Sequence, residues 1–279
     1  MIPDHLPATG IVCETEDELV SFCHEVIQKG TAIQVPEAER RLVRHEMADG
    51  VHIWMYVNPG NEVECLFSFY YPVSSHDLEV ARFIQQDGDR SNLLVGGWLL
   101  DKASEPSTGV GSSSTEDAAA GTGAERRYRL SFVCIDAPLY PRAFEAGAEI
   151  SCQLMGISRK PKLHMDRSAF EQTQRRWGGG MDIQPRTVIP SDVLNLEVDP
   201  FFQGAGLKPY AYVTGIVQET SVHSDPQLDA PFFHTKLDTT GMTLDVLLAE
   251  RAVPTTPERG NILEGHFLIL GMKKPRGST

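Results

Sequence analysis

Three apolar runs decide the fold of this chain: KPYAYVTGIVQETSV (residues 208–222), FFHTKLDTTGMTLDVLLAE (232–250) and GNILEGHFLILGMKK (260–274). β-Branched and aromatic residues are frequent in these runs, as is typical of strands. The middle run contains the turn sequence Asp238-Thr239-Thr240-Gly241, and a glycine opens the last run. We therefore predict four strands, at 211–217, 232–237, 242–248 and 262–272.

In the order of these strands and the placement of their glycines, residues 208–274 resemble an OB-fold, a small five-stranded β-barrel. Gly215 lies where the first strand of such a barrel bends, and Gly265 and Gly271 lie in the fourth strand. No helix precedes the fourth strand and no fifth strand follows it, so an earlier part of the chain could supply the missing strand. The resemblance covers under a quarter of the chain.

The resemblance implies binding of single-stranded nucleic acid through one strand face, which requires stacking aromatic rings and a basic groove. Tyr210, Tyr212 and Phe233 are the candidate binding residues that carry such rings. Tyr210 and Tyr212 would share one face of their strand, because successive side chains alternate. The charge opposes this role: between 207 and 272, four basic residues face eight carboxylates, a net charge of −4.

The preceding 200 residues predict an antiparallel, strand-rich domain with one helix packed on it. The helix is predicted at 15–29, with Thr15 as its N-cap and apolar residues at helical spacing. Two further helices are predicted, at 76–86 and at 168–177, the second capped by Ser168. Strands are predicted at 31–35, 51–57, 62–71, 93–100, 127–135 and 148–158, with a type II turn at 58–61 joining a hairpin.

The predicted fold class is thus β-rich α+β: an antiparallel sheet domain with one packed N-terminal helix, followed by an OB-like β-barrel module. We predict two domains, 1–200 and 201–279. Residues 104–124 (SEPSTGVGSSSTEDAAAGTGA) contain almost nothing that could form a core, so we predict a flexible insertion there. The strands on either side could still pair as a hairpin, because each doubling of loop length costs only about 0.6 kcal/mol.

The formal net charge of −13 repels polyanions unless basic residues cluster locally. They cluster at 156–186, where seven basic residues against three acidic ones give a net charge of +4. The candidate binding residues in this basic segment are Arg159, Lys160, Lys162, Arg175 and Arg176. The simpler interpretation of this basic segment is that its side chains are solvated and offset neighbouring acidic residues. The more specific interpretation is a binding site for an anion or an acidic partner.

We predict no catalytic residues, no metal ligands and no cofactor. The five cysteines are odd in number and none has C-x-x-C spacing, so we interpret them as free thiols that are mostly buried. His164 and Asp166 could form two ligands of a metal site, but no spacing links a third ligand to them. The motifs G-x-S-x-G and H-E-x-x-H do not occur.

These observations leave three functions open. The leading hypothesis is a non-catalytic binding or scaffold protein that acts through protein–protein contacts, with a protein partner or as a homo-oligomer. The alternatives are a single-stranded nucleic-acid-binding module that uses the basic segment 156–186, and a metal-dependent enzyme. No run approaches the roughly 18 apolar residues of a membrane helix, and the amino terminus does not have the pattern of a signal peptide. We therefore predict no membrane partner and a cytoplasmic location.

Overall fold

The computed structural model describes residues 3, 5–36, 38–71, 73–84, 94–100, 127–158, 160–176, 183–191 and 208–274. For residues 82–84, 127, 141, 175 and 176 it describes the backbone alone. The helices are α1 (Glu16–Lys29) and α2 (Arg167–Arg176), with 3-10 turns η1 (Leu6–Thr9), η2 (Ala137–Leu139), η3 (Pro141–Phe144) and η5 (Glu250–Ala252). The strands are β1 (Thr31–Gln34), β2 (Arg41–Glu46), β3 (Val51–Val57), β4 (Val63–Tyr70), β5 (Ser75–Ile84), β6 (Leu94–Leu100), β7 (Arg127–Cys134), β8 (Glu149–Ser158), β9 (Lys162–His164), β10 (Thr187–Pro190), β11 (Tyr210–His223), β12 (Phe232–Thr239), β13 (Met242–Ala249) and β14 (Ile262–Lys273).

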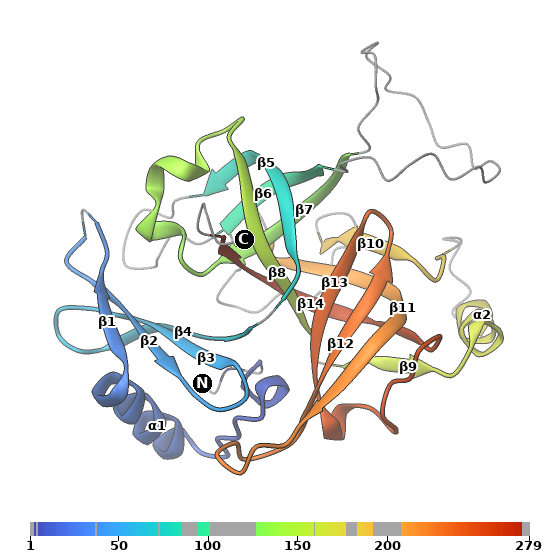
Figure 1. Cartoon of the computed structure of the whole chain (residues 1–279), viewed down its shortest axis with the longest axis horizontal. Helices are drawn as coiled ribbons and strands as arrows, with labels where there is room; N and C mark the ends of the chain where they lie inside the picture. Colours follow the sequence, from blue (N-terminus) through green and yellow to red (C-terminus); the bar gives the residue numbers. More distant parts are fainter. Residues whose placement is uncertain are drawn as a thin grey trace.

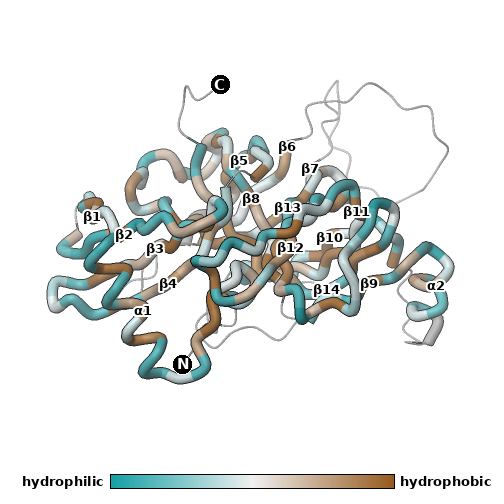
Figure 2. The backbone as a smooth tube through the Cα atoms, turned by 60° about the horizontal axis from the view of Figure 1, so that its bottom comes forward, coloured by the Kyte–Doolittle hydropathy of each residue, from teal (hydrophilic) through white to brown (hydrophobic). Residues whose placement is uncertain are grey.

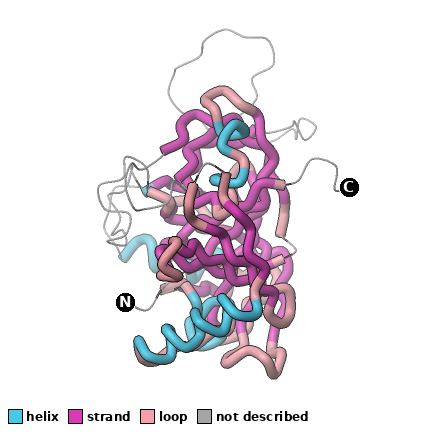
Figure 3. The backbone as a smooth tube through the Cα atoms, turned by 90° about the vertical axis from the view of Figure 1, so that its left-hand side faces the viewer, coloured by secondary structure: helices cyan, strands magenta, loops and turns pink. Residues whose placement is uncertain are grey.

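The fold is β-rich α+β, as predicted, and strands dominate the described chain (Figure 3). An antiparallel N-terminal sheet has the strand order β1-β2-β3-β4, and α1 lies against it (Figure 1). The predicted helix at 15–29 is confirmed: the Thr15 hydroxyl accepts a hydrogen bond from the backbone N–H of Glu18 at 3.2 Å. Cys23 and Val26 are the buried residues of α1, so its amphipathic face fixes it to the sheet.

The hairpin of β3 and β4 is confirmed, but its predicted type II turn is wrong. The left-handed backbone conformation falls on Asn61 (φ 65°) and not on Gly60. The Asn61 N–H donates to the Asn58 carbonyl at 3.0 Å, and the strand register shifts between Tyr56 and Val57. The connection is therefore a turn of type I followed by a residue in the left-handed region, which is a common hairpin geometry.

Two helix predictions need correction. Of the segment predicted as a helix at 76–86, the described residues 76–84 belong to a strand, β5, which pairs with β6 on one side and β8 on the other. Its fully buried Leu78 and Val80 lie two residues apart, which is the period of a strand. The second helix exists as α2, but its cap is Asp166 and not Ser168, because the Asp166 carboxylate accepts from the Ala169 N–H at 2.8 Å.

Ten strands form a second, mixed sheet that closes into two rings of five strands. The first ring consists of β5, β6, β7, β14 and β8, and the second of β11, β12, β13, β8 and β14. The second ring contains the four predicted C-terminal strands, and β8, from earlier in the chain, completes it. Five is also the strand number of an OB-fold barrel.

The antiparallel ribbon of β8 and β14 belongs to both rings (Figure 1). Each ring is a three-stranded meander whose third strand pairs in parallel with the ribbon: β7 with β14 in the first ring, and β13 with β8 in the second. The two rings therefore have the same pairing pattern, with the roles of β8 and β14 exchanged. The predicted domain boundary near residue 200 lies outside the described residues, but strands from both sides of it pair within this sheet.

The described residues form two hydrophobic clusters. One lies between the N-terminal sheet and the outer faces of the rings, and includes Tyr56, Phe69, Tyr210 and Phe232. The other fills the rings, around Phe132 in the first and Phe267 in the second. The hydrophobic segments concentrate in the middle of the molecule, whereas α2 is mostly hydrophilic (Figure 2). No helix within the described ranges is long and apolar enough to cross a membrane.

Candidate functional site

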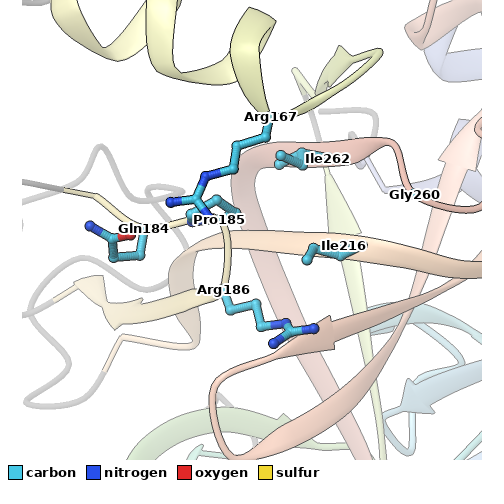
Figure 4. A pocket seen from close by; sticks show the side chains of 7 residues that line it. All are labelled: Arg167, Gln184, Pro185, Arg186, Ile216, Gly260 and Ile262. Carbon is cyan, nitrogen blue, oxygen red and sulfur yellow. The ribbon is translucent and has the colours of Figure 1, made fainter. Parts of the chain in front are cut away.

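A pocket of about 420 Å³ opens on the outer face of the second ring, beside the first residue of α2 (Figure 4). Ile216 of β11 and Ile262 of β14 line it with apolar surface, because they alternate with the inward-facing Val217 and Leu263 of the same strands. The remaining lining residues are Arg167, Gln184, Pro185, Arg186 and Gly260. The pocket therefore combines an apolar floor with polar and cationic walls, which is typical of ligand sites.

The segment before β10 forms one wall of the pocket, and side chains of the second ring hold it in place. The Thr214 hydroxyl donates to the Gln184 carbonyl at 2.6 Å, and the Thr240 hydroxyl donates to the Arg186 carbonyl. β10 continues this segment by pairing with β11. The wall is thus fixed by strand pairing and hydrogen bonds, and the pocket does not depend on ligand binding to form.

Both arginines of the pocket already have one carboxylate partner. Arg167 Nε lies 2.7 Å from Glu171, and an Arg186 Nη lies 2.7 Å from Asp238. Figure 4 shows the two guanidinium groups pointing in different directions, with that of Arg167 beside Gln184 and Pro185. A guanidinium has five N–H donors, so each arginine retains donors for a ligand. Two cations and two carboxylates make the local charge close to zero.

Of the five predicted basic binding residues, the structure describes the side chains of two, Lys160 and Lys162. Lys162 forms an ion pair with the buried Glu264 at 3.3 Å, and Lys160 is exposed. Arg159 lies outside the described residues, and Arg175 and Arg176 end α2, where only their backbone is described. The basic segment contributes to the pocket through Arg167 and Arg186, which the sequence analysis did not single out as binding residues.

A polar cluster around the buried Glu264 of β14, next to the pocket, holds β9 and α2 against the second ring. The Glu264 carboxylate pairs with His164 Nε2 at 3.1 Å and accepts from the Gln174 amide at 2.9 Å. Burial by itself would raise the pKa of Glu264, but hydrogen bonding from His164 and the charge and hydrogen bond of Lys162 hold it below its ordinary value. Burial, and next the charge of Glu264, raise the pKa of Tyr212 to about 12. We interpret this cluster as a structural fastening.

The three aromatic rings predicted for base stacking are buried. Tyr210 packs against the N-terminal sheet cluster, Tyr212 packs edge-on against His266, and Phe233 lies inside the second ring. Base stacking needs an exposed ring face, which none of the three provides in this structure.

His164 and Asp166, considered as two ligands of a metal site, have separate structural roles. His164 pairs with Glu264, and Asp166 caps α2. Among the described residues, no group of three or more histidine, cysteine or acidic side chains has the arrangement of a metal site. The five cysteines are free thiols, and all except Cys13 are buried.

No protein-family model, no curated protein and no solved structure matches this chain. Functional inference therefore depends on the site itself.

Proposed function

We propose that this protein binds a small amphipathic monoanion, such as a carboxylate with an apolar tail, in the pocket between α2, β10 and the second ring. The observation that carries the proposal is the pairing of an apolar floor, Ile216 and Ile262, with the guanidinium of Arg167 at the wall. A carboxylate can accept two N–H groups from a guanidinium while its tail covers the floor. A dianion fits less well, because Glu171 and Asp238 already offset the two arginines.

In this proposal, the pocket binds its ligand and does not convert it chemically. None of its described lining residues carries a hydroxyl, thiol, imidazole or carboxylate group that could act as a nucleophile or a base. The pocket thus supports a binding role, as predicted from the sequence. The ligand that we propose is a small molecule, whereas the sequence-based hypothesis was a protein partner. Contacts with a protein partner or a second copy of the chain stay a prediction. Nucleic-acid binding also stays a prediction, and the burial of Tyr210, Tyr212 and Phe233 makes it the weaker one.

Isothermal titration with octanoate tests the proposal, with octanol and acetate as matched probes that lack the charge or the tail. We expect saturable binding of octanoate that is tighter than that of either matched probe. Arg167→Ala should weaken it by at least about tenfold, because a hydrogen bond to a charged group contributes about 1.5–3 kcal/mol. Ile216→Trp should abolish it by filling the pocket.

Arg251→Ala provides a charge-matched control, because Arg251 is exposed on η5 and does not line the pocket. It should leave octanoate binding unchanged. Equal binding of octanoate to the wild-type protein and the Ile216→Trp variant would contradict the proposal, as would no binding at millimolar octanoate.

A further inference from the structure

A second chemical site is centred on Ser221, near the end of β11. The Ser221 hydroxyl lies 2.9 Å from His223 Nε2, and His223 Nδ1 lies 3.0 Å from the Asp49 carboxylate. Ser221 and His223 are two residues apart on one strand, so both side chains face the same way. Asp49 comes from the turn between β2 and β3. A serine, a histidine and an aspartate therefore meet from two separate parts of the fold.

The hydrogen bonds fix which nitrogen of His223 can act as a base. An ionised carboxylate only accepts hydrogen bonds, so Asp49 orients His223 with its proton on Nδ1. Nε2 is then left as an acceptor that faces the Ser221 hydroxyl. This is the order of contacts by which a serine is activated as a nucleophile: hydroxyl to imidazole, and imidazole to carboxylate.

A second histidine–aspartate pair lies on the other side of Ser221. His234 Nε2 lies 2.6 Å from the fully buried Asp245, which also accepts from the Ser74 N–H at 2.7 Å. Burial would raise the pKa of Asp245, but the hydrogen bonds from His234 and Ser74 hold it below its ordinary value. His234 Nδ1 lies 3.5 Å from the Ser221 hydroxyl, farther than His223 Nε2 at 2.9 Å, so the single hydroxyl proton is donated to His223.

The hydroxyl of Tyr70 lies 3.2 Å from His223 Nε2, farther than the Ser221 hydroxyl at 2.9 Å, which takes the single lone pair of this nitrogen. Burial, and next the charges of Asp49 and Asp245, raise the pKa of Tyr70, so it is a protonated donor. A phenol in this position can donate a hydrogen bond to negative charge that develops beside the serine.

One observation distinguishes this cluster from a purely structural contact between the N-terminal sheet and the second ring. The site reaches solvent: Ser221 is only half-buried, and the Asp49 side chain is 37% exposed. Asp49 and Gly50 have left-handed backbones (φ 59° and 79°) because they are the two central residues of the hairpin turn between β2 and β3, and this turn fixes the position of the Asp49 carboxylate.

We propose that Ser221 is the nucleophile of an acyl-transfer site that accepts small activated esters. Its oxygen bonds to the acyl carbon while His223 Nε2 takes the hydroxyl proton. The bond from the acyl carbon to the leaving oxygen then breaks, and the leaving alcohol receives that proton. Water attacks the acyl-serine in the same way, which releases a carboxylic acid and restores Ser221. Asp49 is a positioning residue, because it acts only through His223.

Hydrolysis of p-nitrophenyl acetate, together with intact-mass detection of a fluorophosphonate adduct, tests this assignment. We expect one adduct, located on Ser221, and a loss of at least about 100-fold in hydrolysis in Ser221→Ala and His223→Gln. Ser224→Ala is the matched control, because Ser224 is an exposed serine three residues away, and it should retain full activity. Asp49→Asn should reduce acylation at least tenfold and change its pH profile while the thermal midpoint stays constant, since asparagine also tolerates a left-handed backbone.

An adduct that persists in Ser221→Ala, or no adduct in the folded wild-type protein, would overturn the assignment. The result is independent of the proposed ligand pocket. Ser221 lies five residues beyond Ile216 on β11, about 17 Å at 3.4 Å per residue. Ile216→Trp should therefore remain labelled, and Ser221→Ala should still bind octanoate.

Discussion

Replacing Gly271 with alanine tests how tightly the two rings are joined along the β8–β14 ribbon. Gly271 pairs with Leu154 of β8 and with Cys134 of β7, so it lies where the rings meet. An added Cβ would lie 2.6 Å from the ring of Phe132 and 2.9 Å from Leu154, and both of these side chains are fully buried. Overpacking of this kind costs about 1–3 kcal/mol.

The expected net loss in the free energy of unfolding for Gly271→Ala is about 1–2 kcal/mol. The overpacking cost is partly offset, because alanine in a strand is about 0.5–1 kcal/mol more favourable than glycine. Gly156→Ala is the matched control on the partner strand. Its Cβ would approach Phe267 no closer than 3.1 Å, so the change should be smaller than that of Gly271→Ala.

Urea unfolding of both variants, with the slope checked for constancy, measures these differences. Adding Phe132→Leu to Gly271→Ala should relieve the contact, so that the alanine costs at least about 1 kcal/mol less in that background. If Gly271→Ala were neutral, or cost as much in the Phe132→Leu background as in the wild-type background, the described packing of the ribbon against the first ring would be wrong.

Three further perturbations give separate tests by denaturant unfolding. Thr15→Ala should lower the free energy of unfolding by about 1 kcal/mol by removing the cap of α1. Burial, against the opposing hydrogen bond from the Lys273 N–H, raises the pKa of Asp136 to about 6, so the folded state holds its proton more tightly than the unfolded state does. The protonated Asp136 therefore stabilises the folded state fully below about pH 4, and this contribution is lost as the pH rises through 6. Between pH 4.5 and pH 7, the free energy of unfolding of Asp136→Asn should rise relative to that of the wild-type protein by on the order of 2 kcal/mol. Glu264→Gln should cost about 1–3 kcal/mol because it disrupts a buried hydrogen-bonded charge, whereas Glu219→Gln, at an exposed pair, should cost under about 1 kcal/mol. A flat difference across pH for Asp136→Asn, or equal costs for the two glutamates, would contradict these assignments.

Local sequence signals predicted most strands because neighbouring residues determine them. The meander of β11, β12 and β13 follows from apolar runs and a turn at Gly241, whose φ of 80° favours glycine. The parallel pairing of Asp245–Leu247 with Met155–Ile157 could not be predicted, because it joins segments about 90 residues apart. The strand β5 was missed for the same reason, since its two partners come from elsewhere in the chain.

The site was predictable only in part. The basic segment 156–186 contributes Arg167 and Arg186 to the pocket lining, but Ile216 and Ile262 carry no sequence signal beyond their alternation along a strand. Glu264 lies about a hundred residues beyond Lys162 and His164 in the sequence. Its pairing with these two residues could therefore be seen only in the folded structure. Asp49 and Ser221 are likewise brought together only by the docking of the N-terminal sheet on the second ring.

The shared ribbon also constrains when the protein can fold during its synthesis. Neither ring can close before β14 has been made, because β14 supplies one wall of both. After β8 is complete at residue 158, the ribosome must add about 115 residues to reach the end of β14, which takes about 6–23 s at 5–20 residues per second. Throughout that interval the nascent meander β5–β7 presents the apolar side chains that later fill the first ring. We therefore expect chaperones to matter most for this chain during its synthesis, and a slowed ribosome between β8 and β14 to lower the yield of native protein.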